Sequence, residues 1–125
     1  MAKGSREKAD HFTLEAKKRG YPARSVFKLE EIDQKNRIIH PGQKVLDIGA
    51  APGSWSLYVL RKQKGKGSLV AVDLKPLTLK VPKQANFTTL TGDAFGDKAL
   101  ELYEKEGPFD LIISDAAPGT TGNRS

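Results

Sequence analysis

Three acidic residues stand where buried strands are expected to end. Asp73 and Asp115 each close a short apolar run, and Asp93 follows a third one within Gly92-Asp93-Ala94-Phe95. In open parallel sheets, ligands bind beyond the carboxyl ends of the strands, so these carboxylates are expected along one edge. There, a carboxylate can accept hydrogen bonds from ribose hydroxyls or from an adenine amino group, and it can balance a positive charge. Each acid taken alone is also common in turns and caps.

A turn containing glycine and proline follows the first apolar run, with the sequence Asp47-Ile48-Gly49-Ala50-Ala51-Pro52-Gly53-Ser54-Trp55. Gly49 and Gly53 allow close backbone approach where a side chain would collide. The following helix would direct its N-terminal amides at a ligand. The loop lacks the Gly-x-Gly-x-x-Gly spacing of dinucleotide sites, which disfavours a NAD-dependent dehydrogenase. It resembles the first motif of S-adenosylmethionine (SAM)-dependent methyltransferases.

The last motif, Ser114-Asp115-Ala116-Ala117-Pro118, bears on the methyl acceptor. An Asn-Pro-Pro-aromatic tetrad, typical of amino-methylating enzymes, is absent, and the chain has no cysteine for methylation of a pyrimidine carbon. Oxygen is therefore the favoured acceptor. Lys28, beside an apolar stripe, can position a hydroxyl group. Because lysine is abundant in this segment, an ordinary surface role for Lys28 stays open.

The elements that must position these residues alternate between strands and helices. Continuous apolar runs predict four buried parallel strands, and helices are expected between them. The N-terminal part predicts a charged helix or partly ordered arm, and then a second helix capped by Ser25 with Val26, Leu29 and Ile32 on its apolar face. The expected ranges are strands 45–49, 69–73, 87–90 and 109–115, and helices 3–19, 26–36, 54–62 and 97–106.

Composition and charge narrow the function classes. The net charge is +6, and residues 1–44 hold eleven Lys and Arg against six Asp and Glu. This excess favours a polyanionic partner, although a solvated lysine-rich surface is the plain alternative. The absence of cysteine excludes disulfides and thiolate metal sites, and no metal site is expected. Without a signal-peptide core or a long apolar run, a cytoplasmic protein with no membrane contact is expected.

Taken together, the motifs resemble those of the FtsJ-like (RrmJ-type) ribosomal RNA 2′-O-methyltransferases. The resemblance implies an α/β, Rossmann-like SAM-dependent methyltransferase fold, with a parallel sheet and helices on both faces. Such sheets normally have about seven strands, so the chain is expected to be truncated after the fourth. The motifs that carry the resemblance are Arg24-Ser25-Val26-Phe27-Lys28-Leu29, Asp47 to Trp55, Asp73-Leu74, Gly92-Asp93 and Ser114 to Pro118.

The resemblance also implies roles for particular residues. The family uses a Lys-Asp-Lys-Glu tetrad, whose first lysine falls on Lys28 and whose aspartate falls on Asp115. The second lysine and the glutamate would lie on later strands. Ser54 stands where many members have a glycine. With the turn residues added, the expected SAM site comprises Gly49, Pro52, Gly53, Trp55, Asp73, Asp93 and Asp115.

These inferences combine into one functional prediction with two alternatives. Residues 1–44 form a basic helical segment that faces RNA and carries Lys28, and residues 45–125 form the SAM-binding half of the methyltransferase domain. The expected activity is methylation of a ribose 2′-hydroxyl in ribosomal RNA, free or in the large subunit, at a uridine by the resemblance. The alternatives are a non-catalytic RNA- and SAM-binding module and a small-molecule O-methyltransferase. The residues expected to contact RNA are Lys17, Lys18, Arg19 and Arg24.

Overall fold

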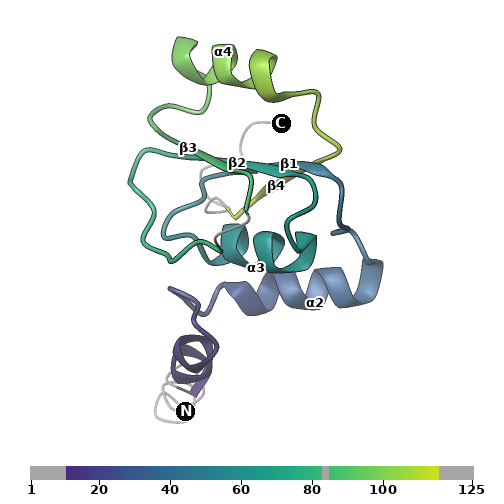
Figure 1. Ribbon diagram of the computed structural model, residues 1–125. Coiled ribbons are helices and arrows are strands. Elements are labelled where there is room, and N and C mark those ends of the chain that lie inside the picture. Colours follow the sequence, from purple (N-terminus) through teal and green to yellow (C-terminus); the bar gives the residue numbers. More distant parts are fainter. Residues whose placement is uncertain (1–10, 83–84, 116–125) are drawn as a thin grey trace, which may run out of the picture.

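The computed structural model describes residues 11–82 and 85–115, which form a parallel sheet with helices on both faces (Figure 1). Ala116-Ala117-Pro118 of the last motif and the start of the expected N-terminal helix lie outside the described residues. Residues 11–18 are helical, and the remaining helices are α2 (Val26–Asn36), α3 (Ser54–Gln63) and α4 (Asp97–Glu106). The strands are β1 (Lys44–Ile48), β2 (Ser68–Asp73), β3 (Phe87–Thr91) and β4 (Leu111–Ser114).

The strand order makes β1 the turning point of the sheet. Within the described residues the order is β3-β2-β1-β4, and every neighbouring pair is parallel. The chain therefore builds outward from β1 to β3, then crosses back to place β4 on the other side of β1. In such sheets the crevice at the point of reversal is where ligands bind. A ligand site is consequently expected at the carboxyl ends of β1 and β4.

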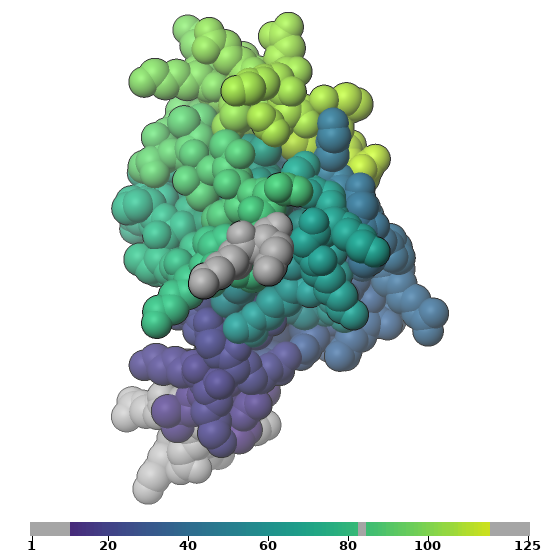
Figure 2. Space-filling view, in the orientation of Figure 1, coloured from purple at the N-terminus to yellow at the C-terminus, as the bar shows by residue number. Residues whose placement is uncertain are grey.

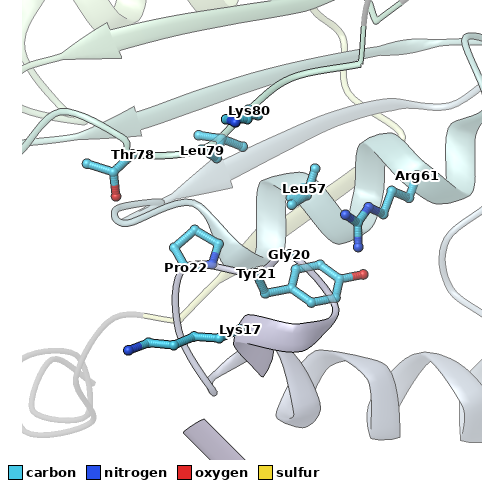
Figure 3. Close-up of a pocket in the computed structure, with 9 residues that line it drawn as sticks. All are labelled: Lys17, Gly20, Tyr21, Pro22, Leu57, Arg61, Thr78, Leu79 and Lys80. Carbon is cyan, nitrogen blue, oxygen red and sulfur yellow. The ribbon is translucent and has the colours of Figure 1, made fainter. Parts of the chain in front are cut away.

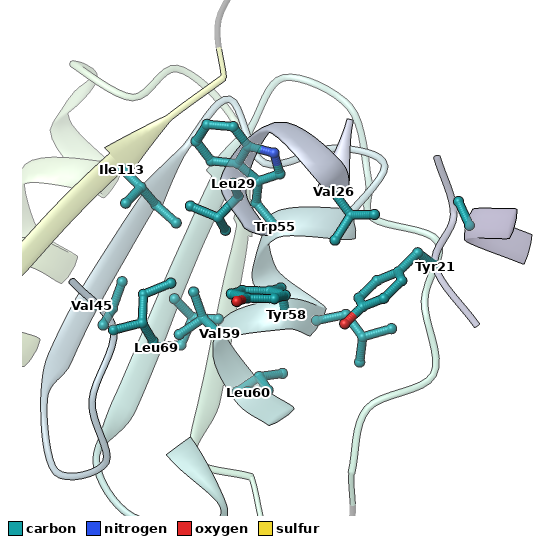
Figure 4. Close-up of a cluster of buried hydrophobic side chains, with 13 residues drawn as sticks. Tyr21, Val26, Leu29, Val45, Trp55, Tyr58, Val59, Leu60, Leu69 and Ile113 are labelled. Atoms are coloured by element: carbon teal, nitrogen blue, oxygen red, sulfur yellow. The ribbon is translucent and has the colours of Figure 1, made fainter. Parts of the chain in front are cut away.

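One face of the sheet is covered by α3 and α2 (Figure 4). The apolar side of α2 presents Val26 and Leu29 to α3, as predicted, whereas Ile32 is half-buried. Helix α3 is buried along most of its length because it lies between the sheet and α2. The cluster contains Val26, Leu29, Val45, Trp55, Leu57, Tyr58, Val59, Leu60, Leu69 and Ile113.

The opposite face is covered by α4. Leu102 and Tyr103 of this helix pack with Phe109 over Leu46 and Val70 of the sheet. The residues left on the outer side of α4 are mainly charged, which explains why a single apolar stripe suffices to place it. The two helical layers confirm the predicted Rossmann-like arrangement with helices on both faces.

Two local predictions were wrong. Ser25 occupies the position before α2, but its side chain makes no capping hydrogen bond, because its backbone is already helical with φ −58° and ψ −18°. The fourth strand begins at Leu111 rather than at residue 109. The Phe109 ring before it packs edge-on against Tyr103 of α4, with ring centroids 6.2 Å apart. Strand β4 pairs only with β1 among the described strands, and Ile112 on it is exposed. No helix in the described ranges is long and apolar enough to cross a membrane.

Candidate active site

The turn after β1 is held in place by three hydrogen bonds from its main-chain amides to β2. The amides of Gly49 and Ala50 both donate to the carbonyl of Val72, and the amide of Ala51 donates to Asp73 Oδ2 at 2.9 Å. Gly53 has φ +123°, a conformation that favours glycine. A Cβ atom at Gly53 would lie 2.7 Å from Cδ2 of Leu79, so in this structure the missing side chain makes room for Leu79.

Asp73 and Asp93 lie beside each other at the carboxyl ends of β2 and β3. The amide of Gly92 donates to the carbonyl of Asp73 at 2.7 Å, which joins the two strand ends. Asp73 Oδ1 also accepts the amide of Lys75, and Asp93 Oδ1 accepts the amide of Phe95. Each carboxylate therefore shapes its own turn. Because an ionised carboxylate has about four acceptor positions, both retain capacity for a ligand.

Two large apolar side chains project from the same turns. Leu74 is 75% exposed and Phe95 is 77% exposed, although a side chain of this size is normally placed against other apolar groups. Leu74 follows Asp73, and Phe95 precedes the start of α4, so an apolar surface accompanies the two acids. This edge can therefore take a flat ligand that has both apolar faces and polar groups.

Lys28 and Asp115 meet although they lie far apart along the chain. The Lys28 Nζ atom lies 3.8 Å from Asp115 Oδ1. Lys28 projects from the first turn of α2, and Asp115 directly follows β4. Partial burial raises the pKa of the Asp115 carboxyl, and the nearby ammonium of Lys28 opposes that rise. The side chain of Lys28 is 62% exposed, which leaves it accessible to a large substrate.

Three contacts from α3 hold the segment that leads to Lys28. The Ser54 hydroxyl accepts the amide of Ala23 at 2.8 Å and donates to its carbonyl at 3.1 Å. The indole of Trp55 donates from Nε1 to the carbonyl of Ser25 at 2.9 Å. The serine that departs from the family pattern thus contributes two hydrogen bonds between α3 and the N-terminal segment. Ser54 directly follows the glycine turn as the first residue of α3, so these bonds place the segment before Lys28 next to that turn.

Asp47 was recognised only as part of the first motif, and its burial was not predicted. It is fully buried within β1, and its Oδ2 atom accepts the hydroxyl of Ser56 at 2.7 Å. Its Oδ1 atom has no hydrogen-bond partner among the described residues. Burial raises the pKa of Asp47 to about 7, an effect reinforced by the charges of Asp115 and Asp73 and opposed by the Ser56 hydrogen bond. An acid inside an apolar run was the available signal, since carboxylates are rarely buried without partners.

A second buried carboxylate, Asp33, shows how a structural acid differs. Asp33 Oδ1 accepts the amide of Ile39 at 2.9 Å, and Oδ2 accepts the hydroxyl of Tyr58 at 2.8 Å. Lys62 lies 3.8 Å from Oδ2 and supplies a charge partner. Both carboxylate oxygens of Asp33 therefore have hydrogen-bond partners within the fold, whereas Asp47 Oδ1 has none among the described residues.

Asp47 also lines a small cavity at the point where the sheet reverses. The cavity has a volume of about 10 Å³, room for one water-sized group. Two carboxylates, from Asp47 and Asp115, reach it, and no cationic side chain lines it among the described residues. It therefore favours a small positively charged group. Its lining residues are Ser25, Asp47, Gly49, Ala50, Ala51, Pro52, Ser54, Trp55 and Asp115.

The cations predicted to contact RNA divide into two groups. Lys17, Lys18 and Arg24 are exposed. Arg19 instead forms an ion pair with Glu30 of α2, and its guanidinium carbon lies 5.3 Å from the ring centroid of Phe27. The Arg19 side chain thus has a structural role that its charge alone did not indicate. In the described part of the chain, no three His, Asp or Glu side chains gather as a metal ion would require.

Comparison with known proteins agrees with this geometry. Residues 21–125 match the family described as FtsJ-like methyltransferase. The chain is 49% identical over 120 residues to a ribosomal RNA large subunit methyltransferase E from Sorangium cellulosum, with 94% of this chain and 54% of the relative covered. It is 46% identical over 126 residues to the protein of the same name from Treponema denticola, with 100% and 62% covered.

The fold matches solved structures as well. A ribosomal RNA methyltransferase from Plasmodium falciparum superposes with a TM-score of 0.65 at 29% identity, covering 78% of this chain and 57% of that one. A cyclopropane-fatty-acyl-phospholipid synthase-like protein from Lactobacillus casei shares the fold alone, with a TM-score of 0.51 and 18% identity.

The chain spans between 54% and 62% of the length of the two curated relatives, which fits the expectation of further strands in the family. The family match extends over most of the chain, from Tyr21 through the glycine turn to the residues that follow β4. The chain belongs to the FtsJ-like methyltransferase family.

Proposed function

We propose that this protein transfers a methyl group from SAM to a ribose 2′-hydroxyl of ribosomal RNA. The observation that carries the proposal is the meeting of Lys28 and Asp115 beside the small cavity that Asp47 and Asp115 both line. A methyl donor and an accessible lysine would thereby share one edge of the sheet. The names of the relatives support ribosomal RNA as the substrate.

The residues at the reversal point suit SAM on chemical grounds. SAM supplies an electrophilic methyl group on a sulfonium, and it also carries an ammonium group. Asp47 and Asp115 would attract these positive charges at the cavity, where low solvent exposure strengthens the attraction. Because the cavity has room for about one water-sized group, it would take the ammonium, and the remainder of SAM would lie along the open edge.

That edge offers groups for the nucleoside part of SAM. Asp73 would accept the ribose hydroxyls, and Asp93 would accept the adenine amino group. Leu74 and Phe95 are exposed beside these two acids and would flank the adenine ring. The turn residues Gly49, Pro52 and Gly53, followed by Trp55, would form the floor next to the methionine part.

Lys28 and Asp115 would act on the acceptor. The Lys28 ammonium can hold the ribose oxygen in line with the methyl group, and alignment of the reacting atoms is a large part of the rate enhancement in such transfers. Asp115 keeps the ammonium in place from 3.8 Å away. The exposed cations Lys17, Lys18 and Arg24 would bind phosphates, which supplies affinity without sequence recognition. A ribosomal RNA substrate agrees with the cytoplasmic location expected from the sequence.

Methylation by a version extended to the length of its relatives tests the proposal. With methyl-labelled SAM, label should enter ribosomal RNA, and the modified linkage should resist alkaline cleavage because its 2′-oxygen can no longer attack the phosphate. Lys28→Ala should lower the rate by about 10²-fold or more, within the range of positioned proton-transfer groups. Its affinity for SAM should stay nearly unchanged.

Lys35→Ala is the matched control, since Lys35 is an exposed lysine in the last turn of the same helix. It should retain full activity. Label that enters bases rather than ribose would contradict the 2′-hydroxyl acceptor. Equal rates for Lys28→Ala and Lys35→Ala would remove Lys28 from the reaction.

A further inference from the structure

An open hollow of about 640 Å³ lies between the N-terminal segment, α3 and the linker that leads to β3 (Figure 3). Its lining residue Leu79 also contacts Gly53 of the glycine turn. Lys17, Tyr21 and Pro22 form one side, facing Leu57 and Arg61 of α3. Leu79 and its neighbours complete it from the linker. Lys28 and Asp115 do not line this hollow, so it is distinct from the candidate active site.

Two further hollows each share one lining residue with the first. A hollow of about 270 Å³ shares Arg61 with it and extends past Lys64 and Pro82. A hollow of about 490 Å³ shares Lys17 with it and extends over the helical segment 11–18. We call the three together the basic groove. Figure 2 shows the N-terminal segment, in purple, at the opposite end of the molecule from α4, so the groove belongs to the end that lacks α4.

The groove combines positive charge with an apolar floor. Among the described residues, Glu15 is the one acidic residue in the lining of the three hollows, against five cationic residues. Apolar atoms come from both walls. The cationic lining residues are Lys17, Lys18, Arg61, Lys64 and Lys80. Pro22, Leu79 and Pro82 supply accessible apolar surface, whereas Tyr21, Leu57 and Leu60 are buried beneath it.

The Arg61 side chain, which lines two of the three hollows, is fixed by two contacts with the N-terminal segment. Its Nη1 atom donates to the carbonyl of Arg19 at 2.7 Å, and its guanidinium carbon lies 4.6 Å from the ring centroid of Tyr21. A Cβ atom at Gly20 would lie 2.8 Å from Arg61 Nη2, so the absence of a side chain there leaves the space that the guanidinium uses. The hydrogen bond to Arg19 uses one of five guanidinium N–H donors, which leaves donors for an anion.

We infer that the basic groove binds a single-stranded stretch of the RNA substrate that flanks the methylated nucleotide. Single-stranded nucleic acids need cations for the phosphates and apolar or planar surfaces for unpaired bases, and the groove offers both. A duplex would conceal its bases and leave the apolar floor unused. The groove runs along α3 from Leu57 to Lys64, about 10 Å at 1.5 Å per residue. This inference rests on RNA being the substrate, as proposed above.

Binding of a fluorescent oligouridine to this chain tests the inference. Lys64→Asn with Lys80→Gln removes two groove charges, and asparagine suits the left-handed backbone of residue 64, where φ is 52°. The matched control is Lys98→Gln with Lys105→Gln, which removes two exposed lysines of α4. The groove variant should lose about tenfold in affinity at low salt, and its salt slope should fall by about 1.4, at about 0.7 per phosphate contact.

Crosslinking gives an independent readout that needs no substitution. With 4-thiouridine in the oligonucleotide, crosslinks should map to peptides containing residues 57–64 or 78–82. Arg61→Gln should reduce this crosslinking while leaving SAM affinity unchanged, because Arg61 does not line the cavity at Asp47.

Several results would overturn the groove. Equal oligouridine affinity and salt slope in the groove and control variants would do so, as would crosslinks confined to the neighbourhood of Lys28. If polyglutamate at equal charge concentration displaces the oligouridine, and the thiouridine oligonucleotide gives no crosslinks to the groove, the groove would instead bind an acidic protein. If the longer protein fails to methylate ribosomal RNA but the groove variant still loses RNA binding, the groove stands and the proposed reaction falls.

Discussion

Replacing Asp47 by asparagine should change how the stability of the ligand-free protein depends on pH. In the folded protein, burial raises the pKa of Asp47 from its ordinary value of 3.8 to about 7. Between these two values the folded state keeps a proton that the unfolded state has released. The free energy of unfolding therefore falls as the pH rises through this window, and the loss is complete above pH 7.

The pKa shift sets the size of this effect. At 1.36 kcal/mol per pKa unit, the loss between pH 4 and pH 8 is about 4 kcal/mol. Asparagine does not titrate, so this loss is absent in Asp47→Asn. Its amide group introduces new buried donors whose cost is the same at every pH. The free energy of unfolding of the variant relative to the wild type should thus rise by about 4 kcal/mol from pH 4 to pH 8.

Urea unfolding followed by the fluorescence of Trp55, the single tryptophan, measures this difference at each pH. Ser56→Ala is an informative companion, because the Ser56 hydroxyl lowers the pKa of Asp47 and its loss should move the window to higher pH. A relative stability that stays constant within about 1 kcal/mol between pH 4 and pH 8 would refute the reasoning, since it would mean that Asp47 is solvated or partnered. SAM should bind Asp47→Asn more weakly than the wild type at pH 8.

Two further outcomes follow from single contacts in the structure. Asp73→Asn should weaken SAM binding by about 1.5–3 kcal/mol, measured by titration calorimetry, because a charged acceptor for the ribose is lost; an unchanged affinity would remove Asp73 from the site. Ser54→Ala should lower the free energy of unfolding by about 1–3 kcal/mol, measured by urea unfolding, because the amide and carbonyl of Ala23 both lose their partner. A stability equal to that of the wild type would mean that water replaces the hydroxyl at both groups.

Local sequence rules were sufficient for most of the elements. Helix α4 runs over 97–106 as predicted, and α3 extends one residue beyond its expected end. Apolar runs located all four strands, and glycine and proline marked the turn that follows β1. These features depend on residues that are near one another in the chain, so periodicity and turn chemistry reveal them.

The sequence also identified the individual acids at the strand ends but not what surrounds each one. The sequence identified Asp47 only as one residue of a motif. Its burial and the lack of a partner for Oδ1 among the described residues result from the packing of β1 between its neighbouring strands, which the sequence does not reveal. Gly53 was expected beside a ligand, which stays a prediction, and nothing in the sequence indicated that Leu79 would lie against it. Arg19 was counted with the RNA-facing cations, and α2 supplies Glu30 to pair with it.

The contact between Lys28 and Asp115 also separates what the sequence indicates from what the tertiary structure decides. The resemblance to a family named both residues, and nothing in their spacing along the chain places them together. Their 3.8 Å approach requires that β4 return to the far side of β1 and that Ser54 and Trp55 hold the segment before α2. Composition and turn chemistry act over a few residues, whereas strand order and helix docking are decided by burial of the whole chain. The residue types were therefore readable from the sequence, and their proximity, burial and free hydrogen-bonding capacity came from the tertiary structure alone.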